Sequence, residues 1–291
     1  MNKLSLLMII TCLASFTALA NSASVWKVSS GEHTLYLGGT LHLLAQEDYP
    51  LPSEYEQAYQ AADTIFFETD MSVLNSAQFQ QKIGQIFRSD IPLSQQLSPG
   101  TYQKLLEYFT QKNINPMTFQ YYKAALVSVS ISMFELESMG FNTTGVDNYY
   151  HQQAMLDNKK VQWLESPQSQ LETLASLGDE DPDKLILYTL FDIEAMPESL
   201  GAVHSAWREG NMERLADYTL VDLKKDFRQI HQGLYVTRNQ NWLPQILKML
   251  KDDKTEFILV GVSHMAGEDG LLKQLAQQGY QIEQLSELTA Q

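Results

Sequence analysis

Two stretches of the chain repeat one order of apolar and polar positions. Near the N-terminus, TLYLGGTLH alternates like a half-buried strand and then reaches a glycine pair and His42. Near the C-terminus, FILVGVSH runs from a continuous apolar strand to His264. Each histidine ends a GxxH motif, and a loop, a helix and a strand are expected to follow. The duplication predicts a core of two similar strand–GxxH–helix–strand halves, with Gly38 and Gly39 ending the first strand or allowing a close approach.

The chain between the halves reads as mostly helical from about 71 to 226. A short apolar run, Thr64–Phe67, and the segment Lys159–Leu164 are expected to be strands, each followed by a carboxylate. Thr118–Leu136 is apolar almost all round, which predicts a buried central helix. Further helices are expected over Ser53–Ala62, Phe79–Phe87, Tyr102–Phe109 after a Pro99-Gly100 turn, Val146–Leu156, Gln168–Leu177, Lys184–Glu194, Glu198–Glu209, Met212–Tyr218, Val236–Lys251 and Glu268–Gln277. The fold class is therefore α/β, with a central sheet built from the chain ends and a large helical insertion that could cap it.

The first twenty residues have the pattern of a secretory signal peptide. Lys3 precedes an apolar run, and Ala18-Leu19-Ala20 matches a cleavage site. Cleavage after Ala20 would leave residues 21–291 as one domain without a membrane span, in the periplasm or secreted; the alternative is an uncleaved anchor.

Composition removes several classes of function. Cys12 is the one cysteine, so residues 21–291 can form neither a disulfide nor a cysteine-ligated metal site, and they lack a thiolate nucleophile. The formal net charge of −15 argues against nucleic acid or an anionic membrane as a partner. It suits a soluble protein, and one that could attract cations.

Four side chains are expected just beyond the carboxyl ends of strands: His42, Glu68, Glu165 and His264. Ligands bind at that edge of an open α/β sheet. A single histidine there is more often a structural one, but the paired placement favours function. Two histidines with one or two carboxylates suit zinc, manganese, iron or cobalt, and an open metal position would activate water for hydrolysis. Arg238 precedes the second half and could clamp a carboxylate, stabilise an oxyanion or form a surface ion pair.

At these residues the sequence resembles the TraB/PrgY/GumN family, which is related to the Tiki metalloproteases. The resemblance lies in YLGGTLHLL, IFFETD, GVDNYYHQQAMLDNKKVQWLES, TRNQNWL and GVSHMAG, in that order. It implies a core of two halves like those of erythromycin esterases and haem-binding ChaN-like proteins, and a metal-dependent hydrolytic site. Carried over by position, it points to His42, His264 and Glu68, with Arg238 and, more loosely, Glu165.

The sequence thus predicts a periplasmic metal-dependent hydrolase, and in particular a peptidase acting on peptides or protein termini. His42, His264 and Glu68 would hold a divalent Mn, Co, Zn or Fe ion, Glu165 or a bound water would act as base, and Arg238 would bind the developing oxyanion. Two alternatives stay open: a non-catalytic metal- or haem-binding protein using the same histidines, and a protein that sequesters a peptide without cleaving it.

Overall fold

The computed structural model describes residues 22–74 and 76–287, so the signal-peptide prediction lies outside the described residues. Six strands of the described chain form one sheet, in the order β6-β4-β7-β2-β1-β8. The strands are β1 Val25–Ser30, β2 His33–Thr40, β4 Thr64–Phe67, β6 Lys160–Trp163, β7 Glu256–Gly261 and β8 Gln281–Gln284. The pairs β6/β4, β4/β7 and β7/β2 are parallel, and β1 runs antiparallel to both of its neighbours. The prediction of an α/β fold with a central sheet is confirmed.

The two GxxH strands lie side by side. β2 pairs with β7 in parallel, with Gly39 opposite Val260 and Thr40 opposite Gly261. Both motifs therefore leave the sheet at the same end. After β2 the chain passes through α1 (Ser53–Ala61) to β4, and after β7 through α14 (Leu271–Gln277) to β8.

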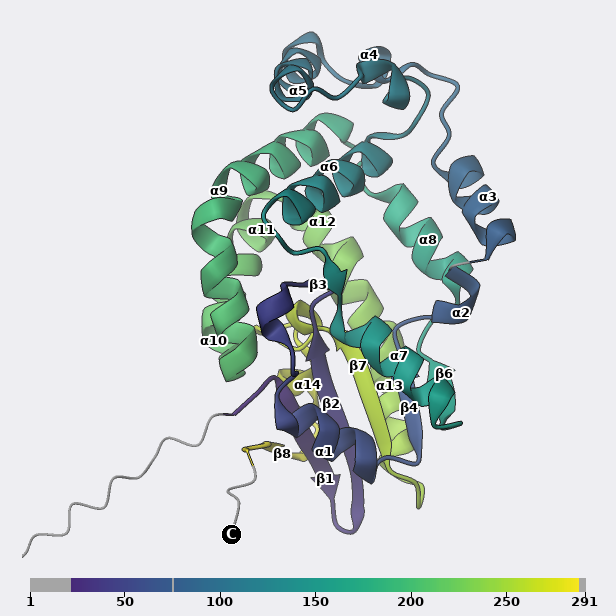
Figure 1. Cartoon of the computed structure of the whole chain (residues 1–291), viewed down its shortest axis with the longest axis vertical. Coiled ribbons are helices and arrows are strands. Elements are labelled where there is room, and N and C mark those ends of the chain that lie inside the picture. The colour runs from purple at the N-terminus through teal and green to yellow at the C-terminus, as the bar shows by residue number, and fades with distance from the viewer. Residues whose placement is uncertain (1–21, 75, 288–291) are drawn as a thin grey trace, which may run out of the picture.

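Helices cover both faces of the sheet (Figure 1). Side chains of β7 alternate between two apolar clusters: Phe257 and Leu259 pack in one, and Ile258 and Val260 in the other. Helices α1 and α7 complete the first cluster, and α13 and α14 complete the second. The bounds of the two helices not yet given are α7 Val146–Leu156 and α13 Thr237–Met249.

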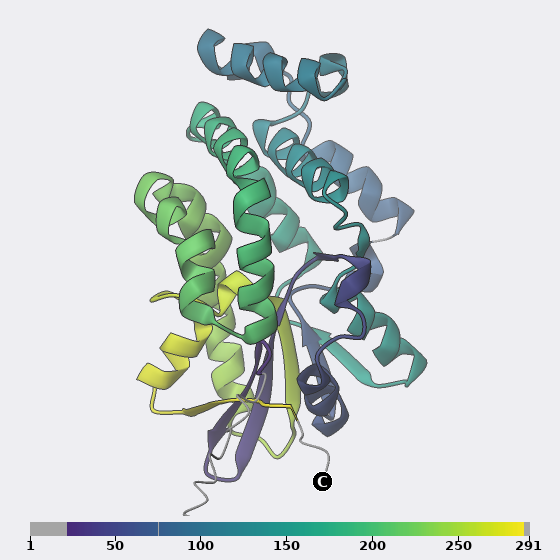
Figure 2. The ribbon, with the colours of Figure 1, turned by 60° about the vertical axis from the view of Figure 1, so that its left-hand side comes forward.

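Residues 71–226, here called the insertion, build a third apolar cluster, which continues into residues up to 235. Figures 1 and 2 show α5, α6 and α9 stacked beyond the end of the sheet where β2 and β7 finish. The insertion also supplies α7 and the edge strand β6. Its other helices are α2 Met71–Leu74, α3 Ala77–Ile86, α4 Leu93–Gln96, α5 Pro99–Gln111, α6 Ala124–Ser138, α8 Pro167–Ser176, α9 Pro182–Glu209, α10 Met212–Thr219 and α11 Val221–Asp226.

The structure decides or corrects several local predictions. The glycine pair does not end β2; the strand continues to Thr40, and the glycines allow the close approach that was the alternative. Pro99-Gly100 is the first turn of α5, because the Ser98 hydroxyl accepts a hydrogen bond from the Thr101 N–H and caps the helix there. The two helices expected on either side of Pro197 are one helix, α9, with the proline inside it.

The helix expected over Thr118–Leu136 begins later and is not buried on all sides. A 3-10 turn, Pro116–Phe119, capped by the Asn115 side chain, takes the first residues, and α6 begins at Ala124. One face of α6 packs in the insertion core, whereas Phe134 on another face is 40% exposed.

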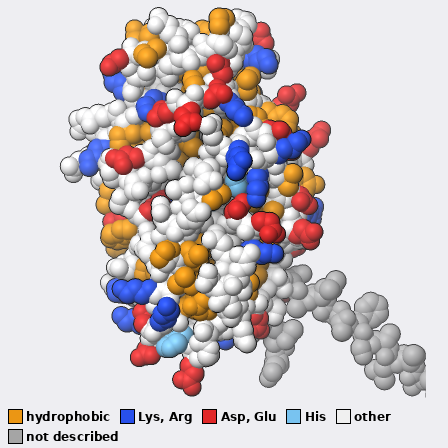
Figure 3. Space-filling model, turned by 180° about the vertical axis from the view of Figure 1, so that it is seen from behind, with side chains coloured by type: hydrophobic (Ala, Val, Ile, Leu, Met, Phe, Trp, Pro, Cys, Tyr) orange, Lys and Arg blue, Asp and Glu red, His pale blue; other side chains and the backbone are white. Residues whose placement is uncertain are grey.

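The back of the molecule carries acidic and basic side chains interspersed, with no continuous basic surface on that face (Figure 3). Among the described residues, no helix has the length and apolar content needed to cross a membrane.

Candidate functional site

A cavity of about 360 Å³ lies between the carboxyl ends of β2, β4 and β7 and the helices of the insertion. His42, Glu68, Arg238 and His264 line it together. The parallel pairing of the three strands explains this convergence, because each strand delivers its next residues to the same edge.

His264 is held in one orientation and one tautomer. Its ring lies between Trp242 and Tyr235, with centroid separations of 4.5 and 5.1 Å. The Asn239 amide donates to the carbonyl oxygens of His264 (3.0 Å) and Asp269 (2.9 Å), so its Oδ1 faces His264 Nδ1 at 2.7 Å. Nδ1 therefore carries the proton, and the Nε2 lone pair points to Arg238 Nη1, which donates to it at 3.0 Å.

Glu68, Arg238 and Glu165 form a buried ion network beside His264. Glu68 Oε1 accepts a hydrogen bond from the Gly261 N–H at 2.7 Å, and its Oε2 accepts from Gln170 at 3.2 Å and from Arg238 Nη2. Arg238 also donates to Glu165, through Nη2 at 2.7 Å and Nε at 3.1 Å. Each guanidinium nitrogen thus has a partner within the chain.

Burial and charge oppose each other in this network. Burial works against ionisation of Glu68, but Arg238, His264 and His42 outweigh it, so the pKa of Glu68 is held well below its usual range. Burial raises the pKa of Glu165 and outweighs the opposing effect of Arg238, and the negative charge of Glu68 adds to the rise. Burial lowers the pKa of His264 to about 3, against the attraction of Glu68, so its imidazole is neutral.

His42 stands at the mouth of the cavity, with its side chain 65% exposed. Its Nδ1 lies 2.9 Å from Asp147 Oδ2, in the first turn of α7. Asp147 raises the pKa of His42, with a smaller contribution of the same sign from Glu68. Gly145 makes this contact possible, since a Cβ there would overlap the carbonyl oxygen of His42. His42 Nε2 makes no hydrogen bond to any described residue, so it is available to a ligand.

The structure brings His42, Glu68, His264 and Arg238 to one cavity, and it places Glu165 behind Arg238, outside the cavity lining. Sequence reasoning missed the side chains that hold these groups. They are Asp147, Gln170, Asn239 and Trp242. Asp147 lies in the GVDNYY block and Asn239 and Trp242 in TRNQNWL, so two of the motifs already noted contained three of them.

The side chains of this cavity suit the predicted metal in their chemistry but do not yet surround one point. No group of three His, Cys, Asp or Glu side chains within 22–74 and 76–287 already converges on one point. The chemistry of the donors nevertheless fits: each GxxH histidine bonds a carboxylate or an amide through Nδ1, which leaves Nε2 as the metal-binding atom. Glu68 Oε1 lies 3.8 Å from His264 Nε2. Arg238 Nη1 lies on the lone pair of His264, so it would have to yield that position to a metal ion.

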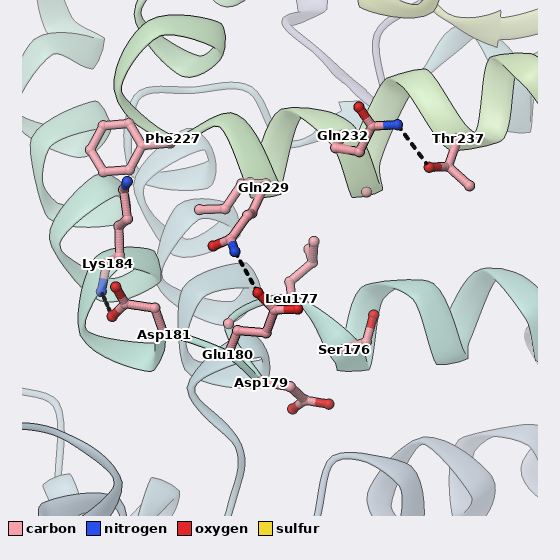
Figure 4. A pocket seen from close by; sticks show the side chains of 13 residues that line it. Ser176, Leu177, Asp179, Glu180, Asp181, Lys184, Phe227, Gln229, Gln232 and Thr237 are labelled. Carbon is pink, nitrogen blue, oxygen red and sulfur yellow. Dashed lines mark hydrogen bonds between the residues drawn. The ribbon is translucent and has the colours of Figure 1, made fainter.

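A second cavity, of about 400 Å³, lies away from the GxxH motifs between the loop after α8 and residues 227–237 (Figure 4). Its polar side chains already pair with each other or with the backbone. Gln229 donates to Glu180, the Asp181 carboxylate caps the N-terminus of α9, and Gln232 donates to Thr237. It holds no histidine and none of the predicted site residues, so we take the GxxH cavity as the candidate site.

Comparison with known families agrees with the motifs. The TraB/PrgY/gumN family model matches residues 24–284, nearly the whole described chain. Comparison with curated proteins and with solved structures gave no match. The family match covers both GxxH motifs, the Glu68 and Glu165 strand ends and Arg238, and on this evidence the chain belongs to the TraB/PrgY/gumN family.

Proposed function

We propose that this protein is an exported hydrolase that uses a divalent transition metal to cleave peptide bonds. The observation that carries the proposal is the shared cavity: both GxxH histidines and Glu68 line it, and each histidine has its Nδ1 engaged, leaving Nε2 for a ligand. Apolar cavities with a few convergent polar groups are the usual form of an active site.

His42, His264 and Glu68 would hold the metal. A bound metal of this kind supplies activation of a water molecule and polarisation of the attacked carbonyl. Asn239 keeps the His264 imidazole in the required tautomer, Asp147 holds Nδ1 of His42 so that Nε2 is left for the metal, and the Gly261 N–H orients Glu68.

Arg238 would stabilise the negative charge that develops on the substrate oxygen. Its Nε and Nη2 donate to the two glutamates, whereas Nη1 donates to His264 and, at 3.4 Å, to the Leu234 carbonyl. Nη1 is therefore the nitrogen that can turn to a substrate oxygen. Glu165, which was predicted as a base, has its carboxylate bound by Arg238 and Trp242, and in this proposal it positions the arginine.

Three finer parts of the prediction stay proposals. They are export to the periplasm, the kinship of the core with erythromycin esterases, ChaN-like proteins and Tiki proteases, and the choice among Mn, Co, Zn and Fe. The parallel β2/β7 pair and the repeated order of strand, GxxH, helix and strand support the proposed kinship.

The test is cleavage of a mixed library of internally quenched peptides by the full chain. Activity is measured after removal of metal by a chelator and again after addition of Mn²⁺, Co²⁺, Zn²⁺ or Fe²⁺. We expect chelation to abolish cleavage and one of these ions to restore it. The double variant His42→Ala/His264→Ala should fold and be inactive, while the control His33→Ala/His151→Ala, with two histidines outside the cavity, keeps activity. Cleavage that survives complete removal of metal contradicts the metal role, and no cleavage by the loaded protein contradicts the hydrolase.

A further inference from the structure

The cavity at the GxxH motifs has a polar floor and apolar walls. The sheet end and α13 supply the floor, with His42, Glu68, Arg238 and His264. The insertion supplies the walls from α6, α8 and α9 and from the residues just after α6. The apolar side chains of these walls are Met133, Leu136, Phe141, Leu174, Leu200 and Val203. Gln170 and His204 also line the walls, and they are bonded to Glu68 and Asp48.

This arrangement explains the unusual sequence of α6, which is apolar on almost every face. Val127 and Ile131 are fully buried in the insertion core. Met133 and Leu136 line the cavity and are only half-buried, and Leu136 packs against the edge of the same core. A ligand that covers these apolar side chains removes apolar surface from water, which is favourable. The positions of Met133 and Leu136 therefore favour an apolar ligand.

The polar floor limits what that ligand is. Its reactive part must lie against His42, His264 and Arg238, because those groups share the cavity with the apolar walls. The volume of about 360 Å³ is near the lower end of the roughly 300–1,000 Å³ of small-molecule sites. That volume holds one bulky side chain with the peptide unit that carries it. A medium-length acyl chain would also fit, so esters form a separate arm of the test.

We propose that the insertion forms a specificity subsite for a bulky apolar side chain next to the cleaved bond, so that the substrates are peptides with Leu, Phe or a similar residue there. This inference rests on the proposed hydrolase function and adds the substrate class. The subsite acts by burying apolar surface, and a pocket of this kind discriminates about 10–200-fold for one methylene group.

The first experiment measures kcat/KM for quenched peptides that differ at one position, with Leu, Phe, Ala or Asp beside the cleaved bond. We expect the Leu and Phe peptides to exceed the Ala and Asp peptides by about 10-fold or more. Leu200→Trp, which fills the cavity, should reverse the order of Phe and Ala. Met133→Ala should weaken the preference for Leu, whereas Phe134→Ala, its 40%-exposed neighbour on α6, should not change it. Equal rates for the Leu and Asp peptides would overturn the subsite.

Two further experiments distinguish failure of the subsite from failure of the proposed hydrolase function. If no peptide is cleaved, binding of the same peptides is measured by calorimetry: tighter binding of the Leu and Phe peptides keeps the subsite and rejects the hydrolase, and equal binding rejects both. The other arm uses p-nitrophenyl esters from acetate to dodecanoate. Rates that rise steadily up to the longest chain would show an acyl-chain site and would overturn the peptide assignment.

Discussion

At the scale of single residues, the site is defined by what holds its histidines. His264 is buried, neutral and fixed by Asn239, whereas His42 is exposed and fixed by Asp147. The two motifs therefore offer the same atom, Nε2, from different environments. A fixed tautomer matters because only the deprotonated nitrogen binds a metal.

Asn239→Ala should free the ring of His264 without emptying the core. We expect metal affinity to fall about 10- to 100-fold, as is typical when the outer hydrogen bond of a ligand is lost. The ¹⁵N chemical shifts of the His264 imidazole should change from values typical of one tautomer to values averaged over both tautomers. Asn241→Ala, on the exposed side of the same helix, is the control. An unchanged tautomer in Asn239→Ala would refute the positioning role.

Glu256 offers a test that is independent of the site. The residue is 3% exposed, and no described residue forms a hydrogen bond with its Oε2. Burial, together with Asp252 and Asp63 and against Lys254, raises its pKa to about 7 from the usual 4.5. The folded protein therefore holds this proton more tightly than the unfolded chain, so stability falls as pH rises from about 4.5 to about 7.

Glu256→Gln should remove this fall in stability with rising pH, because glutamine does not ionise. The shift from 4.5 to about 7 is about 2.5 pKa units, and one unit corresponds to about 1.4 kcal/mol. The variant should therefore be more stable than the wild type by on the order of 3 kcal/mol at pH 8 and nearly equal to it at pH 4. Urea unfolding at both pH values measures the difference. Glu283→Gln, at an exposed position of β8, should follow the wild-type curve. A constant difference between wild type and Glu256→Gln from pH 4 to pH 8 would contradict the shifted pKa.

The sequence located the side chains of the candidate site but not their partners. GxxH, strand-end carboxylates and Arg238 are local patterns, and each was found from its own neighbourhood. The contact between His42 and Asp147 joins residues 105 positions apart, and that between Arg238 and Glu68 joins residues 170 apart. Such pairs depend on how the insertion folds back, which no local pattern reports.

At the scale of elements, the glycine pair of β2 sets the spacing between the two GxxH segments. A Cβ on Gly39 would lie 2.6 Å from Val262 Cγ2, and one on Gly38 would lie 2.7 Å from Phe257 Cε2. Val262 begins the 3-10 turn that carries His264, so the absence of a side chain on Gly39 lets that turn pack directly on β2.

Gly39→Ala should therefore displace the turn that carries His264. We expect a loss of about 1–3 kcal/mol of unfolding free energy, the usual cost of overpacking, together with weaker metal binding. Thermal and urea unfolding measure the first effect. Gly84→Ala is the matched control, because a Cβ there meets nothing within 4 Å and alanine favours the helix α3. Equal stability of Gly39→Ala and the wild type would show that the close approach is unimportant.

Hydrophobic periodicity predicted the bounds of helices and strands well where local sequence determines them. It predicted them less well where tertiary contacts determine the bounds. Thr64–Phe67 and Val146–Leu156 match their predicted bounds, since an apolar run and an amphipathic turn pattern are local signals. The single helix α9 was missed because proline usually interrupts a helix. Here Met196 and Trp207, on opposite sides of Pro197, are both buried, and their packing carries the helix through.

At the scale of the whole molecule, the fold brings two distant motifs to one edge and covers that edge with the insertion. The parallel pairing of β2 with β7 was implicit in the duplicated order of strand, GxxH, helix and strand. The packing of α6, α8 and α9 over the sheet end was not, because amphipathic patterns tell which face of a helix is buried but not against which partner. The cavity walls were therefore beyond prediction from this single sequence.

The central claim is that His42 and His264 serve one metal site, and calorimetric titration of metal-free protein tests it most directly. Mn²⁺, Co²⁺ and Zn²⁺ are titrated into the wild type, His42→Ala, His264→Ala and the double variant, each checked for folding. For one shared site we expect either single substitution to lower the affinity by at least about 100-fold and the double variant to bind no more weakly than the worse single one, which is the non-additivity of residues acting as a unit. Wild-type affinity in either single variant would contradict the shared site and leave that GxxH motif as a structural turn.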